Sequence, residues 1–129
     1  MEGTMRAQVL VEVGRFELKE VPIPQINDDE VLVKVKYCGI CGSDWGSYTG
    51  KYADEVECIP LITGHEVCGT IAEVGANAKG LAIGDRVTYD IVIPCGTCYQ
   101  CCIGESLLCS DFKQIGIHTD GGFAEYRCV

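Results

Sequence analysis

The sequence lacks any apolar run of the roughly 20 residues that a membrane-spanning helix needs. Basic residues are also scarce, because 10 lysines and arginines stand against 19 aspartates and glutamates, giving a net charge of −9. A surface with this balance repels phosphate backbones and anionic lipids, so we expect neither nucleic acid nor a membrane as a partner. The N-terminus has no basic start followed by an apolar core, so we expect no signal peptide.

Internal repeats are absent and helical periodicity is scarce. Short β-branched segments bounded by glycine, proline or acidic residues predominate instead, which is typical of strands joined by turns. Six segments are predicted as strands: residues 6–13, 15–24, 30–37, 65–75, 84–94 and 121–129. One short helical turn is expected within residues 41–50, capped by Ser43 or Asp44. The sequence therefore predicts a mainly β fold, a barrel or a sandwich.

Cysteine is abundant, with ten residues in a chain of 129. A secreted disulfide framework and metal binding in a reducing compartment would both explain this number. Half of the cysteines fall in one segment, CGTCYQCCIGESLLC at residues 95–109. This clustering, together with the missing signal peptide, favours metal binding and a cytoplasmic location.

The clustered cysteines have the spacing of a closed metal site. Cys95, Cys98, Cys101 and Cys109 form C-x2-C-x2-C-x7-C, in which two-residue gaps allow thiolates from one loop to converge on an ion. Four thiolates around Zn²⁺ make a structural site that leaves no position for substrate. The ferredoxin run of iron–sulfur proteins ends in a three-residue gap and a proline, so zinc is favoured. Cys102 is a fifth thiol that could compete with Cys101.

A second metal site is suggested more weakly. Cys41 follows a predicted strand, and His65 and Glu66 begin another. A cysteine and a histidine from separate strand ends can form an open metal site if a third protein ligand joins them. Spacing alone does not settle this, because a single histidine beside a strand is more often structural or exposed.

Five motifs in a fixed order carry a resemblance to a known family. They are CGICGSD at 38–44, GHEVCGTIAEVG at 64–75, GDRV at 84–87, the four-cysteine segment, and GGFAEY at 121–126. Together they closely resemble the N-terminal catalytic half of zinc-dependent medium-chain alcohol dehydrogenases. The CGSD and DGGFAEY segments resemble most the polyol, butanediol and threonine dehydrogenase branch. The likeness covers essentially the whole chain.

The resemblance implies a GroES-like β-barrel with two zinc sites, spanning residues 1–129 and incomplete at its C-terminal end. Cys41 and His65 match the family's catalytic zinc ligands, and Glu66 matches a neighbouring carboxylate that can approach the metal. Ser43 matches the hydroxyl that accepts the alcohol proton. The structural zinc ligands match Cys95, Cys98, Cys101 and Cys109. The implied reaction transfers a hydride from an alcohol to a nicotinamide cofactor.

Several neighbouring residues have two interpretations. Asp44 could cap a turn, or it could orient a metal-binding histidine through a hydrogen bond. Trp45, Tyr48 and Tyr52 could line a substrate cleft, although packing is the commoner role of such side chains. Three further cysteines are expected to be small buried hydrophobic residues: Cys58, Cys68 and Cys128.

The sequence departs from the family pattern in two respects. Gly46 stands where many relatives carry a histidine that passes on the proton, and residues 1–129 contain no G-x-G-x-x-G segment for a nucleotide. We therefore expect this chain to be inactive alone, with NAD(P) and a small alcohol or polyol bound only in a longer parent. The alternative is a free-standing GroES-like zinc module that acts in binding or assembly.

Two further expectations follow from the missing cofactor half. The four-cysteine segment should keep its zinc, because it lies within one loop, whereas the site at Cys41, His65 and Glu66 should be partly occupied or empty. An apolar surface that a cofactor half would cover should favour a homodimer or strand exchange.

Overall fold

The computed structural model describes residues 1–52 and 59–129 as a mainly β structure, which confirms the predicted fold class. Twelve elements follow one another along these residues: β1 (Thr4–Glu12), β2 (Arg15–Pro22), β3 (Val31–Gly39), α1 (Gly42–Thr49), β4 (Leu61–Ile62), β5 (Glu66–Val74), β6 (Arg86–Thr88), β7 (Val92–Ile93), α2 (Tyr99–Cys102), the 3-10 helix η1 (Ser106–Leu108), β8 (Lys113–Gln114) and β9 (Tyr126–Cys128). No helix in these two ranges is long and apolar enough to cross a membrane.

Two antiparallel sheets form the barrel, with strand orders β2-β1-β4 and β6-β5-β3-β9. On β1, Met5, Ala7 and Val9 are buried while the residues between them are exposed, as the strand period of two requires. These side chains pack against Leu32 of β3 and Ile62 of β4 in the main core between the sheets. The alternation in the sequence therefore sets which face of each strand enters the core.

The segment 123–125 joins the two sheets. On one side, Gln8 N–H donates to the carbonyl of Phe123 at 2.8 Å, and Glu125 N–H donates to the carbonyl of Arg6 at 3.2 Å. On the other side, Val35 N–H of β3 donates to the carbonyl of Glu125 at 2.9 Å. This short segment makes backbone hydrogen bonds to β1 on one side and to β3 on the other. Residues 123–125 therefore close the barrel between these two strands.

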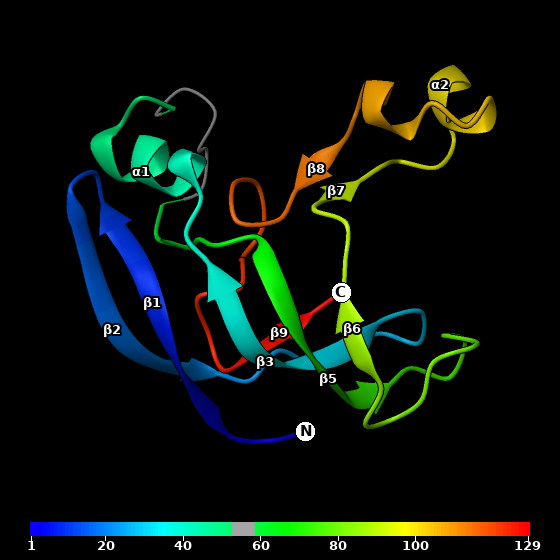
Figure 1. Cartoon of the computed structure of the whole chain (residues 1–129), viewed down its shortest axis with the longest axis horizontal. Coiled ribbons are helices and arrows are strands. Elements are labelled where there is room, and N and C mark those ends of the chain that lie inside the picture. Colours follow the sequence, from blue (N-terminus) through cyan, green and yellow to red (C-terminus); the bar gives the residue numbers. More distant parts are fainter. Residues whose placement is uncertain (53–58) are drawn as a thin grey trace.

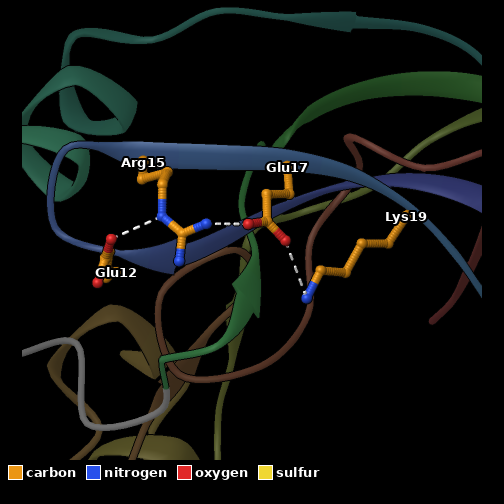
Figure 2. A network of polar contacts seen from close by, with 4 residues as sticks. All are labelled: Glu12, Arg15, Glu17 and Lys19. Carbon is orange, nitrogen blue, oxygen red and sulfur yellow. Dashed lines mark hydrogen bonds and ion pairs between the residues drawn. The ribbon is translucent and has the colours of Figure 1, made fainter.

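The free edge of the first sheet is covered with charge. Arg15 of β2 donates to Glu12 at 2.6 Å and also contacts Glu17, which in turn pairs with Lys19 at 3.2 Å (Figure 2). These side chains are exposed, so each pair contributes little to the free energy of unfolding. Charged side chains along an outer strand instead discourage edge-to-edge pairing with another sheet.

A ribbon of β7 and β8 leads away from the barrel and carries α2 and η1 at its far end (Figure 1). The predicted strand 84–94 is therefore wrong as a single element, because β6 pairs with β5 whereas β7 pairs with β8. At Asp90 the side chain accepts a hydrogen bond from Val92 N–H at 3.0 Å, which makes a turn between the two strands. This break directs residues 95–109 outward.

The region 41–50 is a full helix, α1, rather than one turn. Its N-cap is Cys41 and not Ser43 or Asp44, because Cys41 has extended dihedrals and Asp44 occupies the third helical position. The helix ends at Gly50, whose φ of 78° is the left-handed conformation that favours glycine at helix ends. Gly14, in the β1–β2 turn, donates to the carbonyl of Tyr48 at 2.7 Å, so the hairpin tip holds the end of the helix.

The segment before β5 is held by very close backbone approaches. Gly121 N–H donates to the carbonyl of Ile62 at 2.6 Å, and Gly122 N–H donates to that of Gly64 at 2.7 Å. A Cβ atom at Gly121 would lie only 2.6 Å from the carbonyl oxygen of Thr63 and would overlap that of Gly64. Glycine is therefore required at position 121, because the two backbones leave no room for a side chain there.

Adding a methyl group at this crossing should destabilise the fold. We expect Gly121→Ala to lower the free energy of unfolding by about 1–3 kcal/mol, because backbone atoms must move to admit the Cβ. Gly42→Ala is the matched control, since a Cβ there meets no atom within 4 Å. Denaturant unfolding followed by circular dichroism measures both, and equal midpoints for the two variants would contradict the close approach.

Candidate metal centres

The first candidate centre lies where α1 and β5 begin. Cys41, His65 and Glu66 each offer one ligand atom, and these atoms lie within 4.8 Å of one another. Cys41 precedes α1 directly, while Glu66 is the first residue of β5. Sulfur, nitrogen and oxygen donors at this separation fit the preferences of Zn²⁺. The structure therefore brings together the three residues that the sequence suggested, although Cys41 lies 24 positions before His65.

Ser43 lies beside this cluster. Its hydroxyl oxygen is 3.3 Å from Nε2 of His65. Ser43 reaches this position because it is the second residue of α1, two residues after the N-cap Cys41. Cys41 and Ser43 are partly exposed, so both can meet a small molecule from solvent.

Asp44 holds the two halves of the centre together. One carboxylate oxygen, Oδ2, accepts the N–H of Cys41 at 2.8 Å. The other, Oδ1, accepts the N–H of Gly64 at 3.1 Å, next to His65. Asp44 thus caps the start of α1, whereas the hydrogen bond proposed between it and a metal-binding histidine is not formed, because Oδ1 lies 3.9 Å from Nδ1 of His65.

Asp44 and His65 are both buried, so water does not compete for their contacts. Asp44 and His65 are 5% and 6% exposed, and Nδ1 of His65 has no hydrogen-bond partner. A buried ring nitrogen without a partner is costly, and a slight movement toward Asp44 would satisfy it. With Nδ1 facing Asp44, the other nitrogen, Nε2, faces Ser43. A hydrogen bond from Nδ1 to Asp44 would orient this histidine for metal binding.

Gly39 makes room for Glu66. A Cβ atom on Gly39 would lie 3.1 Å from Cβ of Glu66 and would overlap its carboxylate. The neighbouring Cys38 is outside the cluster, and burial raises the pKa of its thiol to about 11. Cys38 is partly buried, and its thiol donates to the carbonyl of Gly39 at 3.7 Å.

The second candidate centre is the four-cysteine lobe, residues 95–109. The sulfur atoms of Cys95, Cys98, Cys101 and Cys109 lie within 4.8 Å of one another. α2 begins directly after Cys98 and contains Cys101, while Cys109 follows η1. Each short helix thus turns the chain so that its flanking cysteine faces the same point.

Backbone N–H groups surround the lobe's sulfur atoms. Cys109 Sγ accepts from Cys95 N–H at 3.3 Å and from Asp111 N–H at 3.4 Å, and Cys95 Sγ accepts from Cys98 N–H at 3.4 Å. Hydrogen bonds from the backbone of Cys101 and Ser110 lower the pKa of the Cys98 thiol to about 6. Such donors favour thiolates, which are the form that binds zinc.

Cys101 has the opposite tendency. Burial and its hydrogen bonds to the other thiols raise its pKa to about 12. Four adjacent thiols cannot all ionise without a cation between them, so one must keep its proton. A divalent cation bound by the four sulfur atoms would remove this conflict.

The remaining cysteines give mixed outcomes. Cys128 is buried as predicted, but Cys68 is exposed, so the prediction that it is buried was wrong. It lies on the outer face of β5, where the alternation of the strand turns it to solvent. Cys58 lies outside the described residues. Cys102 is exposed, and its thiol donates to the carbonyl of Thr97 at 3.6 Å rather than joining the four sulfur atoms.

Comparisons of this chain with known proteins agree on one family. The family model for the alcohol dehydrogenase GroES-like domain matches residues 27–129. The chain is 40% identical over 126 residues to an uncharacterized zinc-type alcohol dehydrogenase-like protein of Haemophilus influenzae, covering 97% of this chain and 36% of that protein. It is 42% identical over 132 residues to an L-threonine 3-dehydrogenase of Symbiobacterium thermophilum, covering 100% of this chain and 37% of that protein.

A solved structure agrees with these relatives. A short chain alcohol dehydrogenase from Escherichia coli, complexed with NADH, superposes with a TM-score of 0.89 at 38% identity. The match covers 98% of this chain and 36% of that one. The present chain thus spans little more than a third of the length of the proteins it matches.

Neutralising Asp44 should weaken the first centre. We expect Asp44→Asn to lower zinc affinity at Cys41, His65 and Glu66 by about 10–100-fold, because an amide has one acceptor oxygen for two backbone N–H groups. Zinc in the four-cysteine lobe should be unaffected. Competition titration with a zinc-binding dye measures both affinities.

Asp29→Asn is the matched control, since this aspartate is exposed in a turn. Equal zinc affinities for Asp44→Asn and Asp29→Asn would contradict the positioning role of Asp44.

A pair of variants distinguishes the four proposed zinc ligands from the neighbouring Cys102. We expect Cys98→Ser to lose the tightly bound zinc and to leave residues 95–109 open to proteolysis, since one ligand is missing. Cys102→Ser should keep both the zinc and the protection. Native mass spectrometry and limited chymotrypsin digestion, which can cut after Tyr99, Leu107 and Leu108, test the pair, and zinc loss in Cys102→Ser alone would overturn the assignment.

Proposed function

The chain belongs to the alcohol dehydrogenase GroES-like domain family, and we propose on this premise that it supplies the zinc-binding half of an NAD(P)-linked alcohol or polyol dehydrogenase. The relatives named above include a zinc-type alcohol dehydrogenase-like protein and an L-threonine 3-dehydrogenase. An NADH complex of a related enzyme supports the choice of cofactor.

One observation carries this proposal: Ser43 stands 3.3 Å from His65 within the cluster that also contains Cys41 and Glu66. A hydroxyl beside three convergent metal ligands is what an alcohol-oxidising centre requires. The reacting oxygen must approach both a metal and a group that can accept its proton.

Zinc held by Cys41, His65 and Glu66 would act as a Lewis acid toward the alcohol oxygen. Ser43 then accepts the hydrogen bond of that alcohol and passes its proton to water, because its own hydroxyl can donate and accept at once. Asp44 fixes the backbone of Cys41 and that of Gly64, the residue before His65, so that these segments do not rearrange during the reaction.

The hydride needs an acceptor, and residues 1–129 contain no glycine-rich nucleotide segment. We therefore propose that the nicotinamide is supplied by a part of the protein or by a partner outside these residues, and that this chain alone has no dehydrogenase activity. Zinc held by the four cysteines of the lobe would have no position left for substrate and would serve stability.

The proposal can be tested without turnover. In the chain loaded with Co²⁺, the Cys41 thiolate should give a charge-transfer band that changes saturably when ethanol is added. A Cys41→Ser variant supplies the spectrum of the lobe alone for subtraction. We expect Ser43→Ala to keep the band but to bind ethanol about 2- to 10-fold more weakly, because one hydrogen bond is lost.

Incubation of the chain with alcohols and NAD⁺ or NADP⁺ should produce no NAD(P)H. A band that ethanol leaves unchanged would contradict the alcohol-binding role and would favour a zinc module that acts in binding or assembly. Turnover by the 129-residue chain would contradict its dependence on a separate cofactor part.

A further inference from the structure

In the part of the chain that the structure describes, β2 pairs only with β1 and forms the edge of its sheet (Figure 1). On β1, Gln8 N–H and the carbonyl of Arg6 are bonded to residues 123–125, so neither faces β2. Gln8 lies opposite Leu18, and Arg6 lies opposite Glu20. Opposite residues in an antiparallel pair turn their backbone N–H and C=O groups either toward each other or away from each other. The backbone groups of Leu18 and Glu20 therefore point away from β1, toward the free edge.

One face of β2 is apolar beside this edge. Leu18 is 69% exposed, and it lines a groove of about 800 Å³ together with Phe16, Trp45 and Tyr48. The ring of Phe16 stacks on Tyr48 with centroids 5.6 Å apart, and Tyr48 stacks on Trp45 at 5.4 Å. Leu18 is not part of this stack. Covering its side chain with another chain would therefore remove apolar surface from water.

Charge on the other face of β2 restricts which strand can be added to the edge. Arg15, Glu17 and Lys19 alternate in sign along this face (Figure 2). Like charges directly opposite each other destabilise a strand pair, whereas opposite charges stabilise it. The alternation thus discourages most pairings, but it accepts an antiparallel strand that offers a lysine to Glu17 and a glutamate to Lys19. A second copy of β2 is such a strand.

One register of two β2 strands satisfies charge and backbone together. With Leu18 opposite Leu18 of the second copy, Glu17 lies opposite Lys19 and Lys19 lies opposite Glu17. The same register places Phe16 opposite Glu20, and Phe16 faces outward like Leu18 because it lies two residues away. Outward-facing backbone groups therefore meet along the whole pair. Sliding one strand by two residues would instead bring together two copies of Glu17 or two copies of Lys19.

From this match we propose that the free edge of β2 is an interface between two copies of the chain, paired antiparallel about a twofold axis at Leu18. The two first sheets then join into one, with both grooves on the same face and the two Leu18 side chains in contact between them. Because the same surface is used by both copies, the contact closes with two subunits. The proposal goes beyond the alcohol chemistry proposed above and does not depend on it.

Sedimentation equilibrium of the zinc-loaded 129-residue chain tests the proposal. A single strand pair makes a small interface, so we expect a dimer with a Kd of about 10–500 µM that dissociates on dilution. Lys19→Glu should weaken dimerisation by about 10- to 30-fold, because both ion pairs between the copies become repulsive. The swapped variant, Glu17→Lys with Lys19→Glu, should restore dimerisation, since each glutamate again faces a lysine.

Lys79→Glu is the matched control, because Lys79 is exposed in the turn after β5 and its reversal changes the net charge equally. It should dimerise like the unmodified chain. A monomer at every concentration up to about 2 mM would overturn the proposal. Equal dissociation constants for Lys19→Glu and Lys79→Glu would overturn it as well, and so would a swapped variant that dimerises as weakly as Lys19→Glu. Circular dichroism checks that all variants keep the fold.

Discussion

The buried carboxylate of Asp44 is the contact on which the first metal centre depends. Its two oxygens bind the backbone on either side of the centre, at Cys41 and at Gly64. A charged group that is 5% exposed is stable only when it is fully hydrogen-bonded or paired. The same requirement that keeps Asp44 satisfied thus fixes the start of α1 against the segment before β5, and with it the positions of Cys41 and His65.

The two candidate centres draw on different parts of the fold. The four cysteines lie within 15 residues, and their geometry comes from two short helices and from backbone N–H groups of the same loop. The other centre exists only when α1 and β5 are in place, which in turn needs the close contact of Gly121 and Gly122 with residues 62–64. Local order should therefore preserve the four-cysteine lobe, whereas any loosening of the barrel should disperse the cluster of Cys41, His65 and Glu66.

Sequence alone predicts the local features well and the long-range ones poorly. The strands of residues 6–37 and the convergence of the four cysteines follow from alternation and spacing, which act over a few residues. The cluster of Cys41, His65 and Glu66 was suggested only weakly by the residues and was supported mainly by resemblance, because no pattern within either segment shows that they meet. Three features depend on tertiary packing, which residue spacing does not reveal. They are the double contact of Asp44, the position of the Tyr52 ring over Gly46 and the exposure of Cys68.

The count of zinc ions released by graded chelation tests most directly whether two centres of unequal affinity exist. Native mass spectrometry of the unmodified chain, purified without chelator, should show one zinc that persists and a second, of partial occupancy, that is lost at lower chelator concentration. A single zinc at every concentration, or iron in its place, would contradict the two-centre arrangement.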